Sequence, residues 1–216
     1  MRNNFGRKAI ALISTLAIMS TATAVSSFAY NGNNAAYYAN KYATSPNSYY
    51  RYFEGGDCTN FVSQCLRNGG LATTDTKNKS LGINNESSSW YHQKYHVKKY
   101  LFNWCYSEYD DWKISTTWIR VSHEKKGGAG LYQYLSAKSN VEKTKTTDVS
   151  KIISKAKVGD VIQLASSTNA LAGHSIIVTS KSKNDLTVAY HTGNKKNVSF
   201  KSMAKNYKCF YLLHVK

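Results

Sequence analysis

The sequence predicts an α+β domain in which helices near the start of the chain pack on an antiparallel β-sheet. Two early segments, 33–43 and 58–68, carry apolar residues at helical spacing and are followed by residues that stop a helix. The last third of the chain holds short apolar and β-branched segments at hairpin spacing. Helices followed by a run of short strands are typical of an α+β domain with an antiparallel sheet.

The first 29 residues are predicted to be a signal peptide. Three basic residues stand near the start, residues 9–25 carry no charge and are apolar or small, and Ser27-Phe28-Ala29 offers small residues at a cleavage site after Ala29. A retained membrane anchor is the alternative. The run is short for a membrane span and is diluted by serine and threonine, which favours cleavage and secretion.

The two helices have clear ends. In the segment 33–43, Asn33 or Asn34 can cap the start and Pro46 prevents continuation. In the segment 58–68, Gly69-Gly70 marks the end, and an apolar stripe is formed by Phe61, Val62, Cys65 and Leu66.

The middle of the chain is polar and then strongly aromatic. Residues 72–89 are predicted to be a loop, and residues 129–138 a short helix. Residues 90–121 hold all four tryptophans and many tyrosines. So many aromatic rings either fill a core or line a ligand groove, and packing is the commoner use.

Four strands are predicted in the last third. They cover 158–164 (a turn into a strand), 174–179, 186–191 and 209–215. The chain after Ala29 has 187 of the 216 residues, enough for one core, and it shows no internal repeat and no linker-like tract. We therefore expect a single domain over 30–216.

The charge of the chain favours an anionic partner. Removal of residues 1–29 lowers the formal net charge from +17 to +14, and lysine greatly outnumbers arginine. A lysine excess in an exported protein favours peptidoglycan or another anionic wall polymer over nucleic acid, with no stable membrane insertion after cleavage. The alternative is a solvated surface without a specific partner.

Cys58 is the predicted nucleophile. Asp57 stands where an N-cap would, so its carboxylate is expected to accept the amides of Thr59 and Asn60, which places Cys58 at the first helical position. Unpaired amides and the helix dipole at this position favour a thiolate and can stabilise an oxyanion. Gly55-Gly56 leaves room for a substrate beside the sulfur.

Two other interpretations of Cys58 remain open. It can be a buried structural cysteine, or it can form a disulfide with Cys105 or Cys209 in an exported protein. A bond to Cys65 is excluded, because seven residues along a helix span roughly 10 Å.

Two histidines at the ends of successive strands are candidates for the base and its orienting partner. His174 begins one predicted strand, and His191 ends the next, just before Asn194 in a turn. If these strands form a hairpin, all three residues meet at one end of the sheet. His92 and His96 have the spacing of metal ligands on a helix, but no CxxC motif or acidic partner accompanies them, so we expect no metal and no cofactor.

Several blocks along the mature chain resemble one family. They are Tyr30 to Ala43, Tyr49-Tyr50-Arg51-Tyr52-Phe53, Gly55 to Leu66, Ser89-Trp90, Thr117-Trp118, Gly159-Asp160-Val161-Ile162, Gly173-His174-Ser175 and His191-Thr192-Gly193-Asn194. Together they resemble the amidase domain of secreted Gram-positive proteins, a branch of the papain-like, NlpC-type cell-wall cysteine hydrolases. The Gly-Asp-Cys block is the most specific of them.

The resemblance implies a papain-like fold with the nucleophile on an N-terminal helix and the base on a later strand. Cys58 would attack, His174 would be the base and then the acid, and the third residue would be His191 or Asn194, with His191 favoured because it lies on the strand. The implied substrate is an amide bond of peptidoglycan.

Two other functions remain open. A transglutaminase-like acyl transferase would need a carboxylate downstream of His174, for which Asp185 is the candidate. A secreted binding or toxin-like protein would use Cys58 only as a structural residue.

Overall fold

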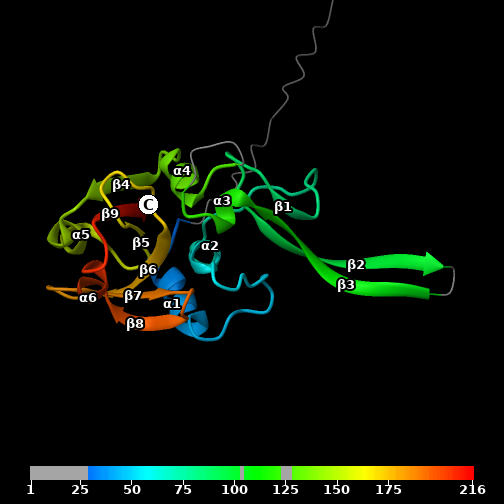
Figure 1. The fold of residues 1–216 in the computed structure, drawn as a ribbon, viewed down its shortest axis with the longest axis horizontal. Helices are drawn as coiled ribbons and strands as arrows, with labels where there is room; N and C mark the ends of the chain where they lie inside the picture. Colours follow the sequence, from blue (N-terminus) through cyan, green and yellow to red (C-terminus); the bar gives the residue numbers. More distant parts are fainter. Residues whose placement is uncertain (1–28, 103–104, 123–127) are drawn as a thin grey trace, which may run out of the picture.

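The computed structural model describes residues 29–102, 105–122 and 128–216. Residues 1–28 of the predicted signal peptide lie outside these ranges. The described chain is a mixed α+β fold with antiparallel sheets, as predicted (Figure 1). Within it, no helix combines the length and the apolar character needed to span a bilayer.

The two N-terminal helices form close to the predicted positions. Helix α1 spans Gly32–Tyr42, and its start is capped by Asn31, whose Oδ1 accepts the amides of Asn33 and Asn34. The cap thus lies two or three residues before the predicted one, because Asn31 has the extended backbone that a cap requires. Helix α2 spans Cys58–Asn68 and ends at Gly69.

A six-stranded sheet forms the centre of the molecule. Its strand order is β4-β9-β5-β6-β7-β8, and every neighbouring pair is antiparallel. The strands are β4 (Val141–Thr146), β5 (Val161–Ala165), β6 (His174–Lys181), β7 (Leu186–Tyr190), β8 (Lys195–Ser199) and β9 (Cys209–Val215). The four predicted strands are present, and β4 and β8 extend the sheet at its two edges.

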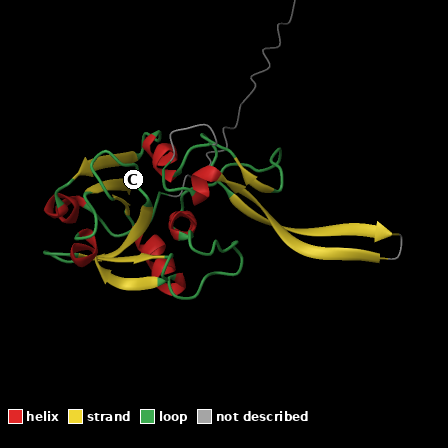
Figure 2. Ribbon diagram, viewed as in Figure 1, coloured by secondary structure: helices red, strands yellow, loops and turns green. Residues whose placement is uncertain are grey.

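Side chains that alternate along the strands divide the core between the two faces of the sheet. Val161, Ile177 and Leu213 pack with α1 and α2 on one face. Ile162, Ile176 and Leu212 pack on the other face with α5 (Val149–Lys155) and α6 (Phe200–Ala204). Figure 2 shows helices on both sides of this sheet. Both short helices on the second face are additions to the predicted elements.

The aromatic segment folds as a ribbon that projects from the body (Figures 1 and 2). Strand β2 (His92–Phe102) pairs antiparallel with β3 (Cys105–Ser115), and β1 (Gly82–Asn84) adds to β3 in parallel. The tryptophans beside the ribbon fill the core: Trp90 and Trp118 are fully buried with ring centroids 4.4 Å apart. Trp118 lies on α3 (Thr116–Ile119), which precedes α4 (Leu131–Ser136), the short helix predicted within 129–138.

Candidate active site

Cys58 is the first residue of α2 and lies against the start of β6. The residue is 7% exposed, and the backbone amides of Ser175 and Thr59 approach its thiol. The Thr59 hydroxyl lies 3.8 Å from Sγ and 3.0 Å from the Ser175 hydroxyl, so Thr59 joins the helix start to the strand start. Cys58 is a free thiol, as are Cys65 and Cys209.

Burial outweighs the helix start in setting the protonation of Cys58. Loss of water raises the thiol pKa above its ordinary value, and the neighbouring Asp57 carboxylate raises it further. The amides of Ser175 and Thr59 act in the opposite direction, as expected for a helix start, but their effect is smaller. The direction of this shift is opposite to the one expected from a helix start alone.

Asp57 occupies the N-cap position but does not cap the helix. Its backbone has φ −93° and ψ 2°, and its side chain accepts no amide from the first turn of α2. Oδ1 instead accepts the Phe53 amide at 2.9 Å and the Asn60 side-chain amide at 2.7 Å. Oδ2 lies 2.5 Å from Nδ1 of His191. The capping prediction is wrong, because a buried histidine and two other donors take the carboxylate away from the helix amides.

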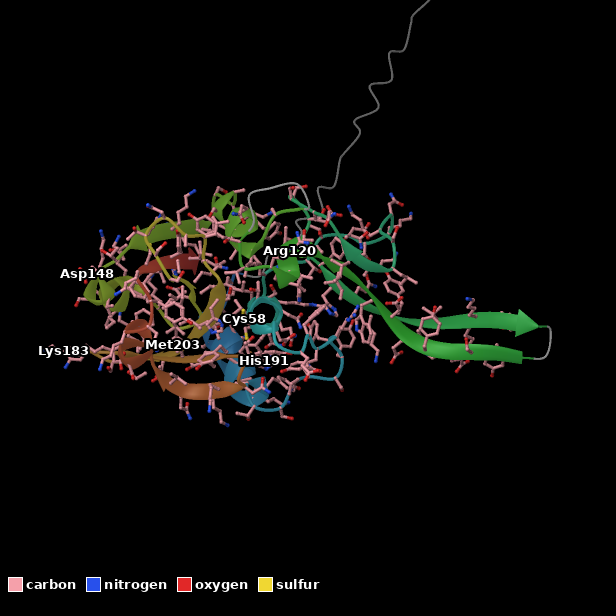
Figure 3. All side chains as sticks on the ribbon, in the orientation of Figure 1. Cys58, Arg120, Asp148, Lys183, His191 and Met203 are labelled. Carbon is pink, nitrogen blue, oxygen red and sulfur yellow. The ribbon has the colours of Figure 1, made fainter. Side chains whose placement is uncertain are left out.

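His191 contacts the residue that precedes Cys58, and both His191 and Cys58 are labelled in Figure 3. Its ring is fully buried and stacks on Phe61 with centroids 4.0 Å apart. Nδ1 faces the Asp57 carboxylate and Nε2 lies 2.9 Å from the Tyr42 carbonyl. Each nitrogen therefore faces an oxygen atom of Asp57 or Tyr42, and neither is bonded to the imidazole of His174. This geometry does not match the predicted role of His191 as the residue that orients His174.

His174 begins β6 at the same end of the sheet. Its ring packs edge-on against Tyr190 with centroids 5.0 Å apart, and burial lowers its pKa to about 4. Ser175 faces α2, and because side chains alternate along a strand, His174 leans toward Tyr190. Among the described residues, no hydrogen bond joins its imidazole to Sγ of Cys58. The two residues therefore lie at the same end of the sheet without a hydrogen bond between their side chains.

Tyr207 is a neighbour of Cys58 that sequence reasoning did not find. Burial raises the pKa of its phenol, and charges on Tyr190 and Cys58 raise it further, so Tyr207 lies within electrostatic range of both. It packs, with Tyr190, against the core on the α6 face of the sheet. No local motif marks Tyr207. It lies between α6 and β9, and only the fold brings this connection close to Cys58.

Among the described residues, neither of the two remaining candidates forms a hydrogen bond with the thiol or with His174. Asn194 is in the turn after β7 with φ 49°, and its Oδ1 is buried without a hydrogen-bond partner in the described chain. Asp185 caps the opposite end of the β6–β7 hairpin, where it accepts the amides of Leu186 and Lys201. The length of β6 separates Asp185 from His174, so Asp185 does not supply the carboxylate that an acyl transferase would need beside His174.

The described residues contain no cluster of three or more potential metal ligands. His92 and His96 lie on strand β2 rather than on a helix, so four residues place them roughly 13 Å apart. His92 is buried and accepts the Arg51 amide, and burial lowers its pKa to about 3. His96 is exposed between Glu108 and Asp110.

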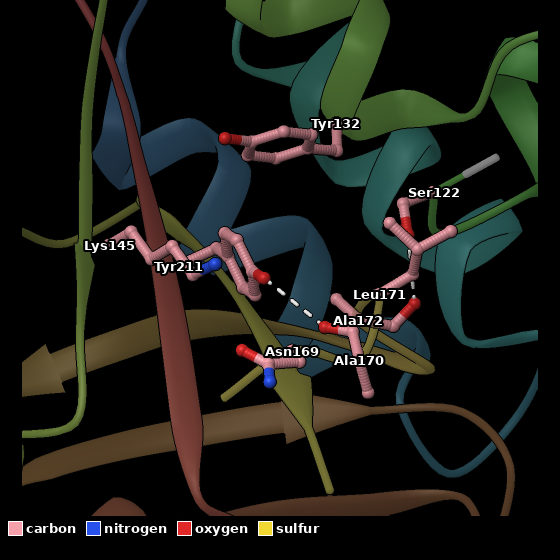
Figure 4. Close-up of a pocket in the computed structure, with 8 residues that line it drawn as sticks. All are labelled: Ser122, Tyr132, Lys145, Asn169, Ala170, Leu171, Ala172 and Tyr211. Carbon is pink, nitrogen blue, oxygen red and sulfur yellow. Dashed lines mark hydrogen bonds between the residues drawn. The ribbon is translucent and has the colours of Figure 1, made fainter. Parts of the chain in front are cut away.

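A cavity of about 260 Å³ lies on the α2 face of the sheet, beside the loop that leads to His174. It is lined by Ser122, Tyr132, Lys145, Asn169, Ala170, Leu171, Ala172 and Tyr211 (Figure 4). Gln163 lies between this cavity and the thiol: its side-chain amide donates to the Val121 carbonyl and to the Ser175 hydroxyl, each at 3.1 Å.

Comparison with known proteins identifies the family of this chain. The chain is 30% identical over 186 residues to the uncharacterized protein YjcM of Bacillus subtilis strain 168. The match covers 82% of this chain but only 34% of YjcM, so the chain spans about a third of the length of that relative. No solved structure matches the chain. A family model described as "Putative amidase domain" matches residues 29–213, and the chain therefore belongs to that amidase family.

Proposed function

We propose that this protein is a secreted cysteine-dependent hydrolase that cleaves amide bonds in bacterial peptidoglycan. One observation carries the proposal: a free cysteine at the start of a helix lies against the amide of Ser175, the residue that follows His174. A thiol, an imidazole and unpaired amides at one sheet end are the groups that acyl transfer through a thioester requires. Membership of an amidase family supports the amide as the bond attacked.

The protonation of the site favours a neutral resting pair. Burial raises the pKa of the Cys58 thiol and lowers that of His174 to about 4, so at neutral pH neither group is charged. On the proposed mechanism, the His174 ring turns toward the sulfur when substrate binds and accepts the thiol proton as sulfur attacks the carbonyl carbon. Catalytic hydrogen bonds are often long in the free enzyme and shorten in the complex.

The same groups complete the reaction. The amides that approach Cys58 would donate to the carbonyl oxygen as it becomes negative. The protonated His174 would then give its proton to the leaving nitrogen, the C–N bond would break, and a thioester on Cys58 would remain. Water, deprotonated by His174, would attack the thioester and release the acid and the free thiol.

Two further features support an extracellular, wall-bound substrate. The first 29 residues have the pattern of a cleaved leader, and the chain after Ala29 carries a formal net charge of +14. A surface rich in lysine would concentrate the enzyme on an anionic wall polymer.

The test compares the exported protein with its Cys58→Ala and His174→Gln variants on purified peptidoglycan. New amino groups and fragments are followed by mass spectrometry. We expect release by the unchanged protein and a loss of about a thousandfold or more in each variant. His96→Gln is the matched control, because His96 is exposed on the ribbon.

Two outcomes contradict the proposal. Equal release by the Cys58→Ala variant would remove Cys58 from the mechanism. Release by no form, together with retention of the protein on sedimented peptidoglycan, would identify a binding protein in which Cys58 is structural.

A further inference from the structure

The cavity beside the loop before His174 is lined by both aromatic and polar groups. Tyr132 from α4 meets Tyr211 of β9 edge-on, with ring centroids 5.2 Å apart. The Tyr211 hydroxyl donates to the Ala170 carbonyl, which holds the loop against the sheet (Figure 4). Two aromatic rings beside backbone carbonyls and an exposed asparagine, Asn169, suit a peptide better than a purely apolar ligand.

The cavity carries positive charge. Nζ of Lys145 lies 5.2 Å above the Tyr211 ring, and a hydrogen bond with the Tyr211 side chain raises the Lys145 pKa above its ordinary value. A lysine side chain is positively charged at neutral pH. None of the described residues that line the cavity is acidic. A carboxylate is therefore the ligand group that this cavity would attract.

A row of side chains across the sheet connects the cavity to the nucleophile. Tyr211 of β9 pairs with Gln163 of β5, and Gln163 pairs with Ser175 of β6. Neighbouring strands lie about 4.8 Å apart, so Tyr211 is roughly 10 Å from Ser175, whose amide approaches Cys58. An extended peptide covers about 3.3–3.6 Å per residue, so about three residues reach from the thiol to the cavity.

The loop gives a second connection. Residues 169–172 line the cavity, and two residues later the same loop ends in His174. The Ser122 hydroxyl donates to the Ala172 carbonyl and holds this part of the loop between the cavity and the base. The loop therefore connects the cavity along the chain to the residue proposed as the base.

We propose that this cavity binds a carboxylate-bearing residue of the peptide substrate, about three residues from the amide that Cys58 attacks. Lys145 pairs with the carboxylate, and Tyr132 and Tyr211 pack on its aliphatic stem. The inference rests on the proposed function, because it names the part of the substrate that the hydrolase recognises.

The test uses acetylated tetra-alanine amides in which one residue at a time is glutamate or, as the neutral control, glutamine, in L and D series. Binding of the dye-labelled peptides to the Cys58→Ala protein is measured by fluorescence anisotropy, and hydrolysis by the unchanged protein is followed in parallel. At one position the glutamate peptide should bind about three- to tenfold more tightly than its glutamine partner, the range of an exposed ion pair with one hydrogen bond.

Three variants of the Cys58→Ala protein give the controls. Lys145→Gln should abolish the preference for glutamate, whereas Lys183→Gln, at the far end of the β6–β7 hairpin, should retain it (Figure 3). Asn169→Trp places a large ring at an exposed position of the cavity and should weaken binding of both peptides.

The outcomes separate this inference from the proposed function. Equal binding of glutamate and glutamine peptides at every position, or a preference that survives Lys145→Gln, would overturn the carboxylate site even if the peptides are hydrolysed. A preference that depends on Lys145, with no hydrolysis of any peptide or of peptidoglycan, would support the site and overturn the hydrolase.

Discussion

The role of His191 can be tested by replacing the residue with alanine. In the structure the ring fills a buried space on Phe61, and its two nitrogens face the Asp57 carboxylate and the Tyr42 carbonyl. Asp57 is 1% exposed. The alanine variant therefore leaves a buried carboxylate that has lost its histidine partner, together with a cavity beside Phe61.

The magnitude follows from these contacts. Loss of a buried hydrogen-bond partner of a carboxyl group, together with the cavity left by the ring, costs about 3–5 kcal/mol of the free energy of unfolding. In a domain of this size each kcal/mol lowers the melting temperature by about 2–4 °C, which predicts a decrease of about 6–20 °C. His96→Ala is the matched control, because that ring is 54% exposed and its pairs with Glu108 and Asp110 should contribute less than about 1 kcal/mol.

Calorimetric or fluorescence-detected melting measures the stability, and initial rates on peptidoglycan at a temperature well below the transition measure turnover. We expect a large loss of stability with turnover per folded molecule within about threefold of the unchanged protein. Reversal of this pattern would refute the reasoning: a melting temperature within about 2 °C and a hundredfold loss of turnover would return His191 to the orienting role.

Three further predictions follow from the same structure. Because the pKa of His174 is about 4, kcat/KM on peptidoglycan should fall only below about pH 4; a half-maximum near pH 6.5 would mean a solvated histidine. At pH 7 Cys58 should react with iodoacetamide more slowly than free cysteine does, and its rate should increase as the pH passes 9.0; peptide mapping measures the modification. Fast reaction at pH 6 would contradict the effect of burial. Gly159→Ala should destabilise the protein by more than about 2 kcal/mol in denaturant unfolding, because its φ is +87° and a Cβ would lie 2.2 Å from the Gly32 Cα. Gly173→Ala, with no atom within 4 Å of the added Cβ, is the matched control and should differ little.

Elements whose signals are local could be predicted from the sequence. Both N-terminal helices carry their apolar spacing and their stop signals within a dozen residues, and α2 starts at Cys58 as expected. The ribbon could not be predicted in this way. Both faces of β2 and β3 are largely exposed along much of their length, so the apolar–polar alternation of a half-buried strand is missing, and pairs such as Lys98 with Glu108 are visible only when the register is known.

Only part of the site could be predicted, because the rest depends on the register between strands. Hairpin reasoning placed His174 and His191 at one end of the sheet, which is correct, but it ignored the two faces of the pleat. His191 stacks on Phe61 beneath α2, whereas His174 packs on Tyr190, which belongs to the opposite core. The register that pairs Ile177 with Ala189 would have separated them, since residues one position apart point to opposite faces.

The burial of Cys58 changes how its position at the helix start contributes to the proposed chemistry. If the amides of Thr59 and Ser175 stabilised a resting thiolate, part of their capacity would be used before substrate arrives, and that interaction would be lost during attack. In the free protein the thiol is neutral because desolvation exceeds the effect of these amides. The amides are then available when charge moves from sulfur to the carbonyl oxygen, and only interactions that are stronger in the transition state than in the ground state accelerate the reaction. On this reasoning a buried, weakly acidic Cys58 is compatible with efficient catalysis, provided that His174 takes the proton as the carbon–sulfur bond forms.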